Sequence, residues 1–108
     1  MSAVLFVAQR ASAAVLAFAV TAHLATILYA VRGGLTAGEV LGRTHGNRWF
    51  LALYVVFVIA VVVHAPIGLR NVLREWTVWR GRSLDAMLAA FALVLLGLGL
   101  RAALAVFL

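Results

Sequence analysis

The chain has 108 residues, of which 67% are hydrophobic and only 11% are charged. A soluble domain of this size needs more polar surface to cover its core, so the composition indicates an integral membrane protein. Cysteine is absent, which excludes disulfides, iron–sulfur clusters and thiolate zinc sites within the chain. The net charge of +6 comes from arginine without lysine, and it indicates membrane topology rather than nucleic-acid binding.

The first predicted transmembrane helix covers residues 3–32 and is interrupted only by Gln9 and Arg10. It is longer than the ~20 apolar residues that cross a bilayer as a helix. Gly33 and Gly34 follow it directly and predict its end. An imidazole, His23, lies well inside this helix.

Two further transmembrane helices are predicted at residues 47–74 and 84–108. We expect Ser83 to N-cap the last helix, with Asp85 in its first turn. Trp76 and Trp79 suit a membrane–water interface. The predicted fold is therefore an all-α membrane protein with three helices in an up-down-up order, forming a single transmembrane domain over residues 1–108.

The arginines predict the orientation of these helices. Five lie at one end of the predicted bundle and three at the other: Arg10, Arg70, Arg74, Arg80 and Arg82 against Arg32, Arg43 and Arg48. Because cytoplasmic loops carry the excess of positive charge, we expect the amino terminus in the cytoplasm.

Three ionisable residues lie well inside the predicted spans, away from their ends: His23, His64 and Arg101. Such groups are rare in membranes and each indicates a functional site. For His64 alone, the ordinary explanation is a neutral ring hydrogen-bonded to a neighbouring helix. The alternative is an axial ligand of haem iron.

The residues that follow His64 favour the haem alternative. Gly68 lies one turn further on the same helical face and leaves room for a flat group, although close helix packing would also use a glycine there. Pro66 removes one helix hydrogen bond. Arg70 and Arg74 reach the membrane edge, where they could pair with haem propionates or anchor the helix.

Two motifs carry a resemblance to a known family. "HAPIGLR" at residues 64–70, with Glu75 beyond it, resembles the second-helix motif of the cytochrome b subunit of succinate dehydrogenase. "QRASA" at residues 9–13 is similar to the His-Arg-x-Ser-Gly motif of that family. Gln9 and Ala13 depart from the motif, whereas Arg10 and Ser12 match it.

This resemblance implies a membrane-anchor subunit of a succinate:quinone oxidoreductase in the bacterial inner membrane. His64 would ligate haem b jointly with a second small membrane subunit, and Arg10 and Ser12 would help form the quinone site. An iron–sulfur subunit and a flavoprotein subunit would bind on the cytoplasmic side. Succinate would react in those partners, because nothing in this chain can bind flavin or a dicarboxylate.

The number of haems is left open. His23 lies roughly 20–25 Å from the cytoplasmic boundary and His64 about 9 Å, at ~1.5 Å per residue. One haem cannot reach both rings. His23 resembles the distal ligand of relatives with two stacked haems, and Arg101 lies at a similar depth, where it could pair with the distal propionates or extend to the surface.

A small membrane transporter, or an assembly protein without haem, is the alternative from another class. Small multidrug transporters have a similar length but need more spans and a carboxylate inside the membrane. The acidic residues of this chain, Glu39, Glu75 and Asp85, all lie in or beside connections. The sequence therefore does not favour transport.

Overall fold

The computed structural model describes residues 3–108, which form helices joined by short connections and contain no strand. The helices are α1 (Ala3–Gly33), α2 (Ala37–Thr44), α3 (Arg48–Trp76) and α4 (Arg82–Phe107). Among these residues α1, α3 and α4 are long and apolar enough to cross a membrane. The prediction of an all-α membrane protein with three spanning helices is confirmed.

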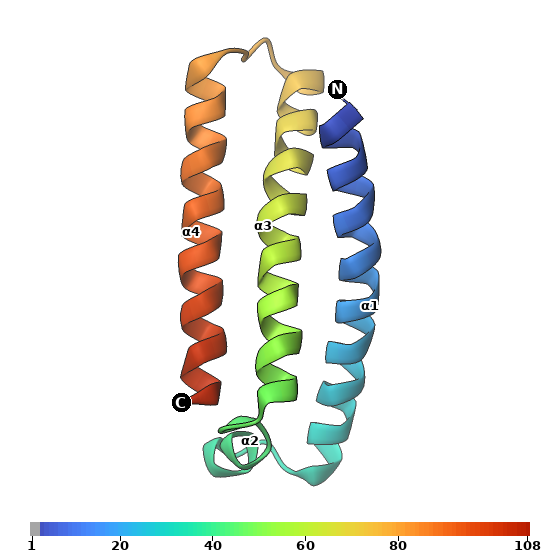
Figure 1. Ribbon diagram of the computed structural model, residues 1–108, viewed down its shortest axis with the longest axis vertical. Coiled ribbons are helices and arrows are strands. Elements are labelled where there is room, and N and C mark those ends of the chain that lie inside the picture. Colours follow the sequence, from blue (N-terminus) through green and yellow to red (C-terminus); the bar gives the residue numbers. More distant parts are fainter. Residues whose placement is uncertain (1–2) are drawn as a thin grey trace.

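The three long helices stand side by side, with α3 in the middle (Figure 1). α3 packs against α1 on one side and against α4 on the other. The upper end of the molecule, as drawn in Figure 1, carries the start of α1 and the connection between α3 and α4. The lower end carries α2 and the end of α4. Because the helices form a row, the two remaining faces of α3 are not covered by α1 or α4.

Most of the buried residues on the three long helices are small, although α4 also buries two leucines. The buried residues are Ser12, Ala19 and Ala30 on α1, Ala60 and Pro66 on α3, and Leu84, Leu88 and Ala103 on α4. Small residues allow helix backbones to approach closely in a membrane. Among the glycines of α3 and α4, the tightest contact is at Gly99, where an added Cβ atom would lie 2.7 Å from Cγ1 of Val58.

The helix ends follow local sequence signals, with one exception. Gly34 ends α1 with a φ of 111°, and its N–H donates to the Ala30 carbonyl oxygen at 2.8 Å. Asn47 N-caps α3 by accepting from the N–H groups of Trp49 and Phe50. The prediction that Ser83 caps α4 is wrong. The cap position is Gly81, whose φ of 91° turns the chain two residues earlier, and the Ser83 hydroxyl accepts a hydrogen bond from Trp79 Nε1.

The short helix α2 was not predicted. It lies across the lower end of the bundle (Figure 1), and the N–H of Gly46, just after it, donates to the Phe107 carbonyl oxygen of α4 at 2.8 Å. Its signal is the N-cap Thr36 with Glu39 three residues later: the Thr36 hydroxyl accepts from the N–H of Glu39 and donates to its carboxylate. Glycines at positions 38 and 42 masked that signal by lowering helix propensity.

Candidate functional site

The two sequence motifs meet in the upper half of the bundle. Nδ1 of His64 on α3 lies 3.5 Å from Oγ of Ser12 on α1. One turn further along α3, a Cβ added to Gly68 would lie 3.4 Å from Nε2 of Gln9. The prediction that both motifs lie at the same level of the membrane is confirmed. Glycine at 68 lets the Gln9 side chain lie directly against the α3 backbone.

The polar groups on the α1 side of this contact are buried. Ser12 is 6% exposed, and its hydroxyl donates to the backbone oxygen of Gln9 at 3.0 Å. The Gln9 side-chain oxygen, Oε1, is buried and has no hydrogen-bond partner within residues 3–108. Arg10 is exposed, and its guanidinium carbon lies 5.6 Å from the centre of the Phe6 ring, one turn earlier on α1. Ser12 and Gln9 therefore point into the helix contact and Arg10 points out of it.

Cations gather above His64 at the upper end. Arg70, Arg74 and Arg80 surround a polar cavity of about 340 Å³ together with Asn71 and Glu75. Arg80 donates to the backbone oxygen of Arg74 at 2.5 Å, which fixes the cavity rim. The arginines predicted to hold propionates thus lie together beside the membrane edge.

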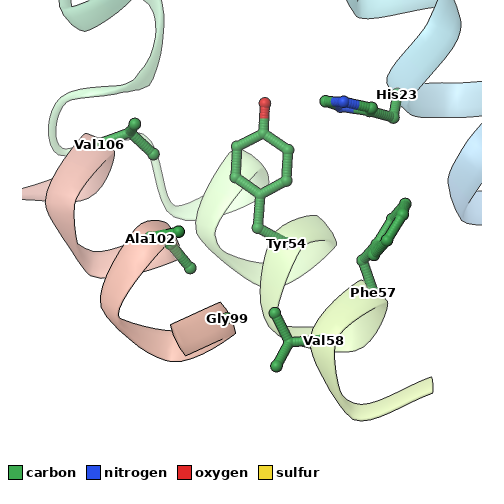
Figure 2. A pocket seen from close by; sticks show the side chains of 8 residues that line it. His23, Tyr54, Phe57, Val58, Gly99, Ala102 and Val106 are labelled. Atoms are coloured by element: carbon green, nitrogen blue, oxygen red, sulfur yellow. The ribbon is translucent and has the colours of Figure 1, made fainter. Parts of the chain in front are cut away.

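His23 lies in the lower half, on α1, in different surroundings. Its ring meets Tyr54 and Phe57 of α3 edge to face, with ring centres 5.8 and 5.9 Å apart. Nδ1 of His23 is buried and lacks a hydrogen-bond partner among the described residues. Figure 2 shows the ring extending from α1 toward these aromatic side chains. The three rings border an apolar cavity of about 340 Å³, which is closed by Val58 and by Gly99, Ala102, Ala103 and Val106 of α4.

Arg101 does not reach this cavity. It is exposed on α4, two residues from both Gly99 and Ala103, which line the cavity. At about 100° per residue, Arg101 therefore points about 160° away from each of them around the helix. The structure does not bring His23 and Arg101 together.

An apolar groove beside Ser12 and the cavity beside His23 lie on opposite faces of the helix row. Ser12, beside His64, lines an apolar groove of about 360 Å³ between α1 and α3, which Val63 also borders. The His23 cavity is bordered on α3 by Val58. Val63 and Val58 lie about 140° apart around α3. A group bound in the groove and a group bound in the cavity would therefore have different neighbours outside this chain.

Comparison with known proteins gives one match. The family model described as "Succinate dehydrogenase/Fumarate reductase transmembrane subunit" matches residues 1–100. The chain belongs to this family. Neither the curated proteins nor the solved structures contain a match.

As a succinate dehydrogenase/fumarate reductase transmembrane subunit, the chain is an integral membrane protein that associates with the other subunits of that complex and with lipid. Large apolar side chains are exposed along α1, α3 and α4, including Val4, Phe18, Leu24, Ile59, Leu93 and Leu98. They supply the apolar surface that such contacts need. The family membership does not favour the alternative of a transporter.

Two aromatic residues of the His23 cavity, Tyr54 and Phe57, were not predicted from the sequence. Tyr54 carries a weak signal, because it is the only residue with a hydroxyl group between Asn47 and Thr77. Its relation to His23 depends on how α1 and α3 cross. No sequence pattern within either helix contains that information.

Proposed function

We propose that this subunit binds haem b through Nε2 of His64, with the second axial ligand supplied by another chain. The observation that carries the proposal is the contact between His64 Nδ1 and Ser12 Oγ at 3.5 Å in the buried α1–α3 seam. It engages one ring nitrogen and leaves the other for a ligand. Imidazole is a common axial ligand of haem iron.

The other residues near His64 suit a haem. The porphyrin supplies four iron ligands and this chain needs to supply one, so a cluster of several ligating side chains, which residues 3–108 do not contain, is not required. Beside Gly68 the space is filled by the Gln9 side chain, which would have to move for a haem to approach the α3 backbone there. Arg70 and Arg74 stand at the membrane edge, where guanidinium groups could form charge-assisted hydrogen bonds to propionates. When bound, the haem would supply one-electron redox chemistry.

A quinone site beside Arg10 is the second part of the proposal. Arg10 is exposed at the surface of α1 near the upper end, so its guanidinium is free to donate to a quinone carbonyl. Arg10 lies two residues from Ala8 and Ser12, which line the apolar groove between α1 and α3. At about 100° per residue its guanidinium points about 160° away from them, so a quinone bound by Arg10 would place its tail outside this groove. Electrons would reach the quinone from a partner iron–sulfur subunit, which is itself bound to a flavoprotein.

The excess of arginines at the upper end supports an orientation with the amino terminus in the cytoplasm of a bacterial cell. That orientation presents the cation cluster at Arg70 and Arg74 to the soluble partners. It also brings the quinone site to the side from which protons enter.

An optical spectrum of the purified complex tests the haem proposal. A dithionite-reduced sample should show b-type absorption bands, and a reduced spectrum that lacks these bands would contradict the proposal. Quinone reduction by succinate should fall in Arg10→Ala while reduction of a soluble dye by succinate persists. Equal loss in both assays would indicate failed assembly rather than a quinone role.

A second haem, ligated by His23, is a further candidate. The unpartnered and buried Nδ1 of His23, beside a cavity of about 340 Å³, favours it. Since Arg101 lies on the far side of α4, a cation for the propionates of this haem would have to come from a partner chain. Two haems per flavin in the purified complex would support this candidate, and one haem per flavin would exclude it.

A further inference from the structure

The Ser12 hydroxyl lies between two possible partners. Oγ is 3.0 Å from the backbone oxygen of Gln9 and 3.5 Å from Nδ1 of His64. A serine hydroxyl has one hydrogen to donate and lone pairs to accept with. A carbonyl oxygen can only accept, so the contact with Gln9 uses the hydroxyl hydrogen. Toward His64, the Ser12 hydroxyl can therefore act only as a hydrogen-bond acceptor.

This arrangement selects one form of the imidazole. A hydrogen bond between an accepting Ser12 Oγ and the ring requires that Nδ1 carry the hydrogen. In the neutral ring Nε2 is then unprotonated and available to a metal. Ser12 is 6% exposed, so bulk water is kept from its hydroxyl.

We propose that Ser12 is the positioning residue of His64, and that it fixes the tautomer with hydrogen on Nδ1 and the lone pair on Nε2. This inference rests on the proposed haem function. It gives Ser12 a different role from the one its motif implied, because the only hydrogen of its hydroxyl is engaged by Gln9 and cannot be donated to a quinone. Arg10 keeps the quinone role alone.

The contact has an electronic consequence for a bound haem. A hydrogen bond from the free N–H of a ligating imidazole to an acceptor orients the ring and makes its other nitrogen a stronger donor. A stronger donor stabilises the ferric state relative to the ferrous state. Removing the acceptor should therefore move the haem midpoint potential to a more positive value.

The test compares Ser12→Thr with Ser12→Val in the purified complex. The two replacements have nearly the same shape and differ in the hydroxyl, so packing effects are matched. Ser12→Thr should keep the haem midpoint potential and the low-spin electron paramagnetic resonance signal of the unmodified complex. Ser12→Val and Ser12→Ala should both raise the potential and change that signal. Thr21→Val is the control, because the Thr21 hydroxyl is exposed and bonds only the Ala17 carbonyl of its own helix.

The outcomes separate the inference from the function on which it rests. An unmodified complex without haem overturns the proposed function. If haem is present but the Thr and Val variants have the same midpoint potential and the same signal, only the positioning role of Ser12 is overturned. A change confined to the Michaelis constant for quinone, with the haem signals unaltered, also overturns it and returns Ser12 to the quinone site.

Discussion

The two histidines of the α1–α3 contact are one residue type in two environments. His64 projects from α3 toward a buried hydroxyl on α1, while His23 projects from α1 toward aromatic rings on α3. Nδ1 of His64 has a polar partner, whereas Nδ1 of His23 has none within residues 3–108. The difference shows that a histidine inside a span does not define its own role. The residues that face the two rings across the α1–α3 contact differ, with a serine hydroxyl beside His64 and aromatic rings beside His23.

The wider surroundings of the two histidines also differ, being more polar around His64 than around His23. His64 lies below a cluster of arginines at the upper end, and Ser12 beside it borders an open groove. His23 borders an apolar cavity to which α4 contributes small side chains, and Arg101 points away from it. The upper site has the charge that an anionic cofactor needs, and the lower site has only space.

Removing His64 should have the largest effect of any single change. His64→Ala deletes the proposed iron ligand, so the reduced b-type spectrum should be lost or strongly weakened while the chain still inserts in the membrane. His45→Ala is a suitable control, because that side chain is exposed in the connection at the lower end. A full b-type spectrum in His64→Ala would overturn the distinction between the two histidines.

Haem analysis of His23→Leu sharpens the comparison at the lower site. If His23 ligates a second haem, the unmodified complex should contain two haems per flavin and the variant one. Tyr54→Phe serves as its control, because it keeps the ring that packs on His23 and removes only a hydroxyl. A ratio of one in the unmodified complex, unchanged in His23→Leu, would leave His23 as a packing residue.

Glycine substitutions should separate the close contact at the lower cavity from open positions. Gly99→Ala places a methyl group 2.7 Å from Cγ1 of Val58, and a β-branched side chain in a helix cannot easily rotate away. Such overpacking costs about 1–3 kcal/mol, which thermal unfolding in detergent would report. Gly97→Ala is the matched control, because nothing lies within 4 Å of its added Cβ. Equal stability of the two variants would contradict the close packing of α3 on α4.

Asn47→Ala should have the smallest effect. It removes the side chain that caps α3 at its lower end, a loss of about 0.5–2 kcal/mol. Amide hydrogen exchange should increase in the first turns of α3, toward Tyr54, and stay unchanged around His64. An increase that spreads to His64 would indicate that the two sites share one cooperative unit.

Much of the fold could be predicted from composition and length, because the bilayer requires long apolar helices whatever their detailed sequence. The sequence predicted that Ser12 and His64 lie at the same depth, because an up-down pair of helices brings residues near the same membrane edge together. The rotation of each helix was not predictable. The rotation of α4 depends on how small residues such as Gly99 and Ala103 pack, and it makes Arg101 face away from His23.

The start of α4 and the presence of α2 were not predicted, because two local sequence signals compete at each of these places. Ser83 is a good cap by residue type, but the positive φ available to Gly81 began α4 earlier. The N-cap signal at Thr36 was present, yet the glycines around it concealed α2. In both places the choice depends on tertiary contacts that a single segment does not record.

The hydrogen bond from Gly46 to Phe107 has a consequence for the order of biogenesis. A chain made from its amino terminus completes α1, α2 and α3 before α4 emerges. The last carbonyl groups of α4 then arrive without helical partners, and an unsatisfied carbonyl in apolar surroundings costs several kcal/mol. The N–H of Gly46 supplies one of the missing donors from a connection that is already in place. The first connection of the chain thus supplies a hydrogen bond that α4 cannot form until its end reaches the level of α2.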